Sequence, residues 1–251
     1  MKIFHDSWIM FKRCMLISTR NPETIVMAIV TPFFLMALFG TLFGNIADIG
    51  DYNYIDFIIP GIILQAVAQA SQYTAINITN DMTKGMIDRF RSMPVSKASV
   101  LIGHAASSVV RNIVTTAVII ATAFLIGFRP SAGFFDWLAV AGILLLAITA
   151  ISWIAVLCGL ISKSPETSAG LMLPLFILPF ISSGFAPTET LPTWLRTFAE
   201  NQPMSPIINS TRALMLDLPL EGNLPPALTW CIGITAVAFA AAVYKYKRKL
   251  V

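Results

Sequence analysis

The side chains that could do chemistry in this sequence are polar groups set within long apolar stretches. Gln65, Gln69 and Gln72 recur at helical spacing, so they share one face of a helix. Asn112 and Thr115 lie together in a later apolar stretch. Amide and hydroxyl groups in apolar surroundings bond either to a neighbouring helix or to solute and water along a polar path. The spacing leaves both interpretations open.

Covalent or metal-dependent chemistry is not indicated. The two histidines, His5 and His104, lie far apart, and the three cysteines (Cys14, Cys158 and Cys231) show no metal-ligand spacing. No apolar stretch supplies a histidine that could activate a serine or cysteine as a nucleophile. The sequence also lacks the G-x-x-x-x-G-K-[ST] motif that binds the phosphates of ATP. We therefore expect no catalytic residue, no metal site and no cofactor bound by this chain.

The composition indicates a membrane protein. Of the 251 residues, 56% are hydrophobic and 12% are charged, and the mean hydropathy is +0.75, whereas a soluble domain has about 25% charged residues. A helix needs about 20 mostly apolar residues to cross a bilayer. Six stretches approach this length: 24–44, 57–80, 105–127, 137–161, 167–184 and 226–244. We therefore expect an all-α polytopic membrane protein with six transmembrane helices, forming a single domain over residues 1–251.

Charged residues indicate how these helices are oriented. With both termini in the cytoplasm, most of the 17 lysines and arginines lie inside, and Arg129, Arg196 and Arg212 lie outside. The net charge of +4 follows this distribution and does not indicate a nucleic-acid partner. Arg111 is the one charged residue within the six stretches. It lies near enough to the inner end of its stretch for the guanidinium to reach the cytoplasmic membrane surface by snorkelling. Since proton- or sodium-driven carriers use acidic residues inside the membrane, and none lies in these stretches, energy must come from another protein.

The first 20 residues are amphipathic. Phe4, Trp8, Phe11 and Met15 recur at helical spacing, while charged residues take the other faces. This pattern predicts an interfacial helix over residues 1–20 that lies in the headgroup plane and leads into the first transmembrane helix.

Residues 81–97, between the second and third apolar stretches, form another amphipathic segment. Met86, Phe90 and Met93 fall on one helical face, and Pro94 disfavours helix at the residue before it. A short helix faced by Met and Phe fits a groove on another protein, and it equally suits a connector lying on the lipid surface. Both interpretations remain open on physical grounds.

The fifth stretch and the segment after it are irregular. Pro174 and Pro179 each remove a helical hydrogen bond, so we expect this helix to be kinked or broken and to pack inside the bundle. Its start, "SPE" at residues 164–166, has the composition of a helix N-terminus. Residues 185–225 contain two short helical patterns, "LPTWLRTFAE" and "SPIINSTRALML". We expect both to dip into the outer membrane face.

Four motifs follow one another over nearly the whole chain. They are "FIIPGIILQ" (57–65), "RFRSMPVSKASVLIGH" (89–104), "SKSPETSAG" (162–170) and "FISSGFAPTETLPTWLRTFAENQPMSPIINSTRAL" (180–214). The second fits the pattern R-x-R-S-x-P-[VL]-S, and the fourth fits S-S-x-F-x-P-x-x-x-[ML]-P-x-W-L. In these motifs the chain resembles the type-2 ABC transporter permeases, in particular the daunorubicin-resistance branch of multidrug exporters. Gln202 stands where that family's pattern has Asn.

The resemblance implies a half-transporter. Such a subunit pairs with a second permease copy, identical or different, and binds two copies of a separate ABC ATPase, which binds ATP and Mg²⁺. Residues 81–97 would be the cytoplasmic coupling-helix region, residues 185–225 would be re-entrant, and the first and fifth transmembrane helices would form the dimer interface. The implied ATPase-coupling residues are Met86, Asp88, Arg89, Phe90, Arg91, Met93, Pro94, Ser164 and Glu166.

These implications lead to one expectation of function. The chain would be a multi-pass permease subunit in a bacterial cytoplasmic membrane that moves a drug or other amphipathic small molecule outward. Its transport path would be lined by Gln65, Gln69, Gln72, Asn112 and Thr115. Two alternatives stay open: a permease for a lipid-linked glycan or lipid, and a membrane sensor or regulatory scaffold that transports nothing.

Overall fold

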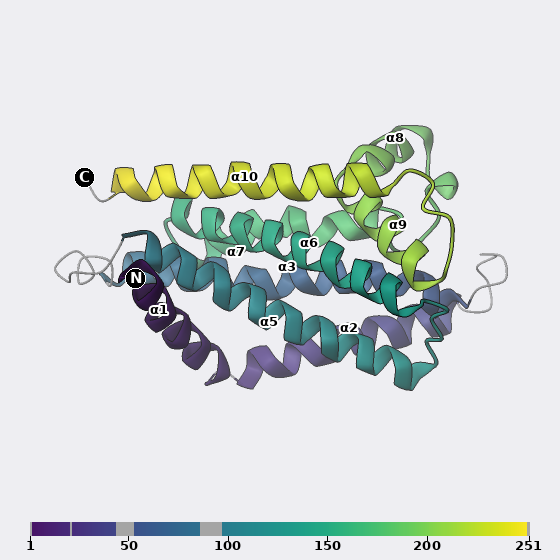
Figure 1. The fold of residues 1–251 in the computed structure, drawn as a ribbon, viewed down its shortest axis with the longest axis horizontal. Coiled ribbons are helices and arrows are strands. Elements are labelled where there is room, and N and C mark those ends of the chain that lie inside the picture. The colour runs from purple at the N-terminus through teal and green to yellow at the C-terminus, as the bar shows by residue number, and fades with distance from the viewer. Residues whose placement is uncertain (1, 21, 44–52, 86–96, 250–251) are drawn as a thin grey trace.

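The computed structural model describes residues 2–20, 22–43, 53–85 and 97–249, and within these ranges it contains helices and no strand. Figure 1 shows an elongated bundle of long helices with two short helices at one end. The elements are α1 (Lys2–Thr19), α2 (Pro22–Phe43), α3 (Tyr54–Thr83), α5 (Lys97–Ile126), α6 (Phe134–Ile161), α7 (Pro165–Ile177), α8 (Thr193–Asn201), α9 (Met204–Met215) and α10 (Leu224–Lys249), with 3₁₀ helices η1 (Leu178–Ile181) and η2 (Thr188–Thr190).

Each of the six apolar stretches falls on a helix. By length and composition, four helical segments in the described ranges could cross a membrane: Tyr54–Thr83, Ser99–Ile126, Phe134–Ile161 and Leu224–Arg248. The first and fifth stretches contain shorter apolar helices, at Val30–Phe43 and Pro165–Ile181. The chain is therefore all-helical and has the character of a polytopic membrane protein.

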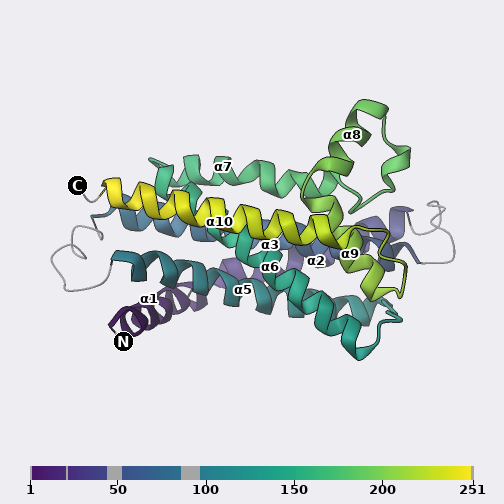
Figure 2. The same cartoon turned by 45° about the horizontal axis from the view of Figure 1, so that its top comes forward.

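The two ends of the bundle differ. Both chain termini lie at one end, together with the last turn of α3 and the first turn of α5 (Figure 1). The short helices α8 and α9 lie at the opposite end, and Figure 2 shows α8 projecting beyond the long helices. The two patterns expected within residues 185–225 are thus confirmed as helices.

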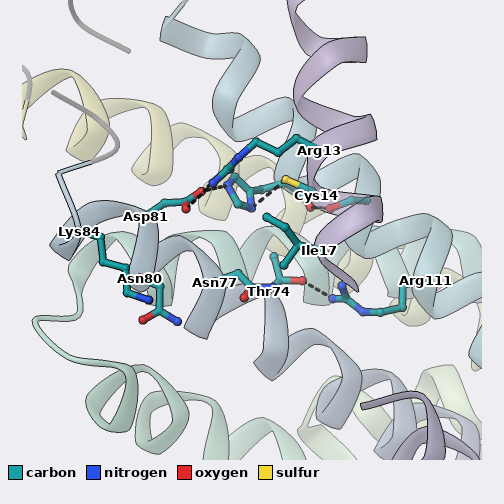
Figure 3. Close-up of a pocket in the computed structure, with 11 residues that line it drawn as sticks. Arg13, Cys14, Ile17, Thr74, Asn77, Asn80, Asp81, Lys84 and Arg111 are labelled. Atoms are coloured by element: carbon teal, nitrogen blue, oxygen red, sulfur yellow. Dashed lines mark hydrogen bonds and ion pairs between the residues drawn. The ribbon is translucent and has the colours of Figure 1, made fainter. Parts of the chain in front are cut away.

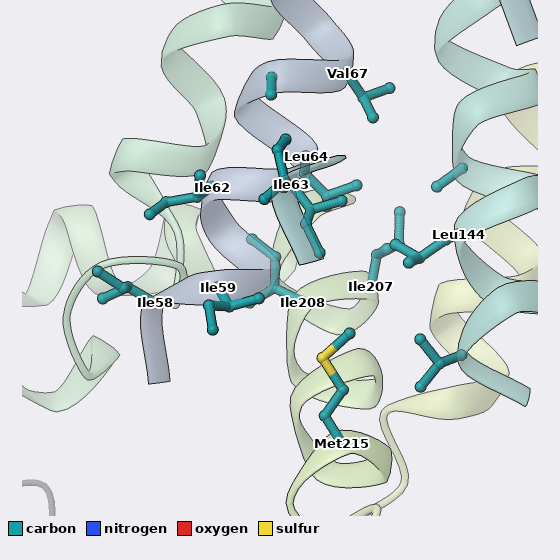
Figure 4. Packing of buried hydrophobic residues seen from close by; sticks show 14 of the residues in the cluster. Ile58, Ile59, Ile62, Ile63, Leu64, Val67, Leu144, Ile207, Ile208 and Met215 are labelled. Carbon is teal, nitrogen blue, oxygen red and sulfur yellow. The ribbon is translucent and has the colours of Figure 1, made fainter. Parts of the chain in front are cut away.

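Helix α3 is the centre of the bundle. It packs against α2, α5, α6, α7 and α9, and every residue from 57 to 68 is buried. A helix that is buried all round is expected to be apolar all round, and this segment is so with the exception of Gln65. Figure 4 shows the isoleucines of this segment grouped with Leu144 of α6 and with Ile207 and Ile208 of α9.

Helix α3 also extends beyond the apolar stretch 57–80 at both ends, so it includes Asp56 and Asp81. The expectation that this transmembrane helix carries no acid therefore holds for its apolar part only. The polar ends are compatible with a long helix because they reach beyond the hydrocarbon core, about 30 Å thick, which 20 residues already span.

Helix α7 is broken as the two prolines predict. Its α-helical part ends at Ile177, and a 3₁₀ turn that contains Pro179 follows it. The expectation that it packs inside the bundle is wrong for the single chain, because Ser168 and Met172 are its buried residues. Leu171 and Leu173 are exposed instead, since α7 packs mainly on one side, against α3.

Helix α1 spans the expected N-terminal segment, and it packs on the bundle with a face other than the aromatic one. Met10, Cys14 and Ser18 pack inward at spacings of four, whereas Phe4 and Trp8 are 81% and 50% exposed. The inward face contacts α5, where Gly103 lets Met10 approach closely. The aromatic face therefore stays available to lipid, as an interfacial helix requires.

Glycines set the closest approach between long helices. A Cβ atom added to Gly159 of α6 would lie 2.6 Å from the carbonyl oxygen of Ala75 in α3. Thr79 of α3 donates a hydrogen bond to the Gly159 carbonyl over 3.0 Å, so the two backbones meet at this position. Small residues at such contacts allow helices to associate in membranes, where dispersion contacts replace the hydrophobic effect.

We expect Gly159→Ala to destabilise the chain by about 1–3 kcal/mol, because a backbone atom cannot move aside for the added methyl group. The matched control is Gly142→Ala on the same helix, where an added Cβ atom meets nothing within 4 Å. The midpoint of thermal unfolding in detergent is the measurement. Equal midpoints for the two variants would contradict the close approach of α3 and α6.

Candidate functional site

A charged cluster joins three helices at the end of the bundle that holds both termini. Arg13 of α1 donates two hydrogen bonds to Asp81 of α3, over 2.7 and 2.8 Å. Nε2 of His104 on α5 lies 3.2 Å from the same carboxylate, and its Nδ1 lies 3.5 Å from the Cys14 sulfur. Figure 3 shows Arg13 and Cys14 of α1 beside Asp81 of α3. The bond from Arg13 to Asp81 raises the pKa of the Arg13 guanidinium.

The sequence analysis did not predict that Cys14, His104 and Asp81 meet, with the imidazole placed in space between the thiol and the carboxylate. Both Asp81 oxygens accept bonds from Arg13, and the cysteine and histidine are 7% and 4% exposed. The cluster therefore joins α1, through hydrogen bonds, to the facing ends of α3 and α5. The signal that could have indicated it is the acid placed just after a long apolar stretch.

Arg111 occupies the next layer inward. Its guanidinium donates to the Ala70 carbonyl over 3.0 Å, to the hydroxyl of Thr74, and to Ser18 of α1 over 3.4 Å. It also lies over the Tyr73 ring, 5.4 Å from its centre. This cation therefore stays within the protein, where carbonyl and hydroxyl groups take the place of water.

Asn112 belongs to a polar chain between helices. Its amide nitrogen donates to Ser71 of α3 over 2.8 Å and lies 3.5 Å from Ser108. Ser152 of α6 donates to Ser108 over 3.0 Å. These bonds connect α3, α5 and α6, and they are the helix-to-helix contacts that such residues make in membrane proteins.

The expected path residues do not form one lining within the single chain. Gln72 donates to the Ala169 carbonyl of α7 over 3.1 Å, on a different side of α3 from the Ser71 bond to Asn112. Thr115 is 6% exposed and Gln69 is partly buried. That the five residues line a path therefore stays a prediction.

Gln65 is the polar side chain with the most unusual surroundings. It is fully buried within the apolar centre of α3, and neither its amide oxygen nor its nitrogen has a hydrogen-bond partner among the described residues. Leaving a buried polar atom unpaired costs about 1–3 kcal/mol. Gln65 therefore destabilises this packing arrangement, and water, solute or a rearranged neighbour would relieve the cost.

Most of the expected ATPase-coupling residues, from Met86 to Pro94, lie outside the described residues. The remaining pair begins α7: the Ser164 hydroxyl accepts the Thr167 backbone N–H over 3.3 Å, and Glu166 lies in the first turn. This arrangement confirms the helix start, because the side chain satisfies a free N–H group and the acid complements the positive helix end.

Arg212 holds the opposite end together, and the sequence analysis missed this. The residue is 8% exposed in α9 and donates to the Phe57 carbonyl of α3 over 3.0 Å. It also donates to the Ser183 carbonyl in the turn after η1 and to Asn209 over 3.0 Å. Its guanidinium lies 3.7 Å from the centre of the Phe57 ring, a cation–π contact. An arginine within the apolar pattern "SPIINSTRALML" was the available signal.

We expect Asp81→Asn to lower the free energy of unfolding by about 1.5–3 kcal/mol, because it removes charge-assisted hydrogen bonds from a largely buried pair. The control is Glu200→Gln, which breaks a 2.7 Å pair with Arg196 whose side chains are 43% and 45% exposed. Such an exposed pair contributes about 0.2–1 kcal/mol. Thermal unfolding of both variants is the test, and a smaller effect at Asp81 would refute the proposed importance of the cluster.

We expect Arg212→Ala to loosen the turn after η1, since two buried carbonyl groups lose their donor at a cost of about 1–3 kcal/mol each. The exposed arginine of α8 offers the control, Arg196→Ala. Limited proteolysis should cut the first variant faster between α7 and α9 and leave the second unchanged. Equal cleavage rates would show that Arg212 does not hold this turn.

The sequence is similar to those of known membrane permeases over nearly its whole length. The family model of ABC-2 type transporters matches residues 5–216. The chain is 30% identical over 243 residues to a daunorubicin resistance ABC transporter permease of Streptomyces coeruleorubidus, covering 94% of this chain and 84% of that protein. It is 30% identical over 237 residues to a probable doxorubicin resistance ABC transporter permease of Mycobacterium tuberculosis, covering 91% and 83%. It is 25% identical over 206 residues to an inner membrane transport permease of Escherichia coli, covering 79% and 78%. The chain therefore belongs to the ABC-2 type transporter family.

Proposed function

We propose that this chain is the membrane-spanning permease subunit of an ATP-driven exporter. The observation that carries the proposal is its similarity, over nearly the whole chain, to permeases named for resistance to daunorubicin and doxorubicin. Helices that are long and apolar enough to cross a membrane agree with it. A drug or other amphipathic small molecule is the cargo class that we infer.

The proposed topology has six transmembrane helices, formed by α2, α3, α5, α6, α7 with η1, and α10. Both termini lie in the bacterial cytoplasm, and α8 and α9 form a re-entrant segment at the outer face. Two features support this orientation: both termini share one end of the bundle (Figure 1), and the last turns of α10 carry Lys245, Lys247 and Arg248. Basic residues concentrate on the cytoplasmic side of membrane proteins.

The proposed energy source is a separate ABC ATPase that binds ATP and Mg²⁺. Two copies of it would dock at residues 81–97 and at the start of α7, where Ser164 and Glu166 lie. The charged cluster of Arg13, Asp81 and His104 supports this arrangement, because it joins the ends of α3 and α5 that flank the docking segment. Movement of that segment would then be passed to α1 as well.

A second permease copy would complete the transporter. The exposed apolar residues of α2 and α7 support pairing through the first and fifth transmembrane helices, although lipid also covers such surfaces. In α7 these residues are Leu171, Leu173 and Ile177. Gln65, Gln69, Gln72, Asn112 and Thr115 are then proposed to reach the path when the two halves separate, which would relieve the unpaired amide of Gln65.

Co-purification with the ATPase is the first test. Arg89→Glu and Phe90→Asp should abolish association with the ATPase in mild detergent while membrane insertion is kept, because each places an acid on the proposed docking surface. Lys245→Glu makes the same charge reversal at the end of α10 and should leave association intact. Normal co-purification of both docking variants would refute docking at residues 81–97.

Export is tested in cells that express the permease with its ATPase. Such cells should accumulate less daunorubicin than cells that carry the Arg89→Glu permease, because only the first pair couples ATP hydrolysis to the membrane subunit. Fluorescence of the retained drug measures the difference. Equal accumulation, with association intact, would refute this cargo class and leave the permease assignment standing.

A further inference from the structure

A polar cavity of about 280 Å³ lies beside the charged cluster, between α1, α3 and α5. Figure 3 shows the side chains that line it. Thr74, Asn77 and Asn80 recur along α3 at a spacing of three, and Lys84, the residue that caps the helix, continues the same face toward the cavity entrance. Arg111 faces them from α5. Small-molecule sites begin at about 300 Å³, so the volume suits a small polar group better than a whole drug.

The cavity has a deep end and an exposed end. Thr74, which is 2% exposed, binds Arg111 at the deep end. Lys84 is exposed, and the ten-residue step from Thr74 to Lys84 extends about 15 Å along the helix axis. A ligand would therefore enter past Lys84 and reach toward Arg111. This entrance lies at the end of the bundle that holds both termini.

The charge of the lining is positive. Arg13, Lys84 and Arg111 face one acid, Asp81, and both oxygens of that acid already accept bonds from Arg13. Lys84 forms no ion pair with a described residue. A concave site lined by one sign of charge concentrates ions of the opposite sign.

Several hydrogen-bond donors along the cavity are unused. The guanidinium of Arg111 donates to Ser18, Ala70 and Thr74, so it contributes positive charge to the deep end of the cavity. The side-chain amides of Asn77 and Asn80 form no hydrogen bond to any described residue. An oxyanion accepts strong hydrogen bonds from amide and ammonium donors, which Asn77, Asn80 and Lys84 offer to the cavity.

We propose that this cavity binds a phosphate group, with Arg111 and Lys84 supplying charge at its two ends and Asn77 and Asn80 supplying amide donors between them. The surroundings favour the phosphate of a membrane lipid. Ile17, which lines the cavity from α1, is 38% exposed, and the exposed apolar residues of α1 continue from it. A lipid could therefore place its headgroup in the cavity and its chains along α1.

The charges also predict which lipid headgroup is preferred. Lys84 at the entrance would repel the ammonium group of phosphatidylcholine, whereas phosphatidylglycerol carries no such cation. The phosphate site is separate from the drug path that we propose. The proposal of a phosphate site does not depend on which cargo is transported. Occupation of the site would fix α1 against α3 and α5.

Native mass spectrometry of the purified full chain can count the lipids that stay bound. We expect several-fold more phosphatidylglycerol than phosphatidylcholine to be retained. Lys84→Gln and Asn77→Leu should each reduce the retained phosphatidylglycerol by about tenfold, the size of one charge-assisted hydrogen bond. Lys247→Gln on α10 removes the same charge from an exposed site at the same end of the bundle, and it should leave retention unchanged.

A second arm distinguishes a lipid from a soluble phosphate. Inorganic phosphate at millimolar concentration is added, and the rate at which an amine reagent labels Lys84 is measured. Slower labelling with phosphate, and no preference for phosphatidylglycerol, would assign the site to a soluble phosphate compound. The proposal is overturned if Lys84→Gln and Lys247→Gln retain equal phosphatidylglycerol and phosphate does not protect Lys84. The Lys84 and Asn77 variants alter the cavity lining and leave Arg111, which joins three helices, in place.

Discussion

The close packing around α3 is the constraint on which the rest of this structure depends. This helix packs against α2, α5, α6, α7 and α9, and its segment from 57 to 68 is buried on every side. In a membrane, apolar side chains gain little by leaving lipid, so helices associate where their backbones approach closely and where polar groups bond. Gly61, packed on Gly184, and Gly159, packed on Ala75, provide that approach at two levels of α3.

Charged groups close the bundle at each end. At one end, Asp81 accepts bonds from Arg13 and His104, and so joins α1 to α3 and α5. At the other, Arg212 donates to backbone carbonyls of α3 and of the turn after η1. Both arrangements place the charge where protein groups compensate its loss of water. For the apolar middle of the bundle to move relative to its ends, the hydrogen bonds of Asp81 and Arg212 must also rearrange.

The ends of α3 and α5 flank the proposed docking segment, and the cluster of Arg13, Asp81 and His104 joins both ends to α1. Inside the bundle, Gln65 is buried without a partner in the described part of the chain. An exporter must alternate between two arrangements of similar free energy, and an unpaired buried amide raises the free energy of the arrangement that the structure shows.

Hydropathy and charge along the sequence were enough to predict an all-helical membrane protein, the positions of its helices, the broken helix at Pro174 and Pro179, and the two short helices between residues 185 and 225. These features are local, because the length of an apolar run and the chemistry of proline act within one helix. The motifs also identified the family. Which side chains meet across helices was decided by the tertiary structure. The inward face of α1 is Met10 and Cys14, not the aromatic face, and α7 lies at the surface of the single chain. The bonds of Asp81 and Arg212 join residues far apart in sequence, and spacing along one helix contains no information about its rotation against the next.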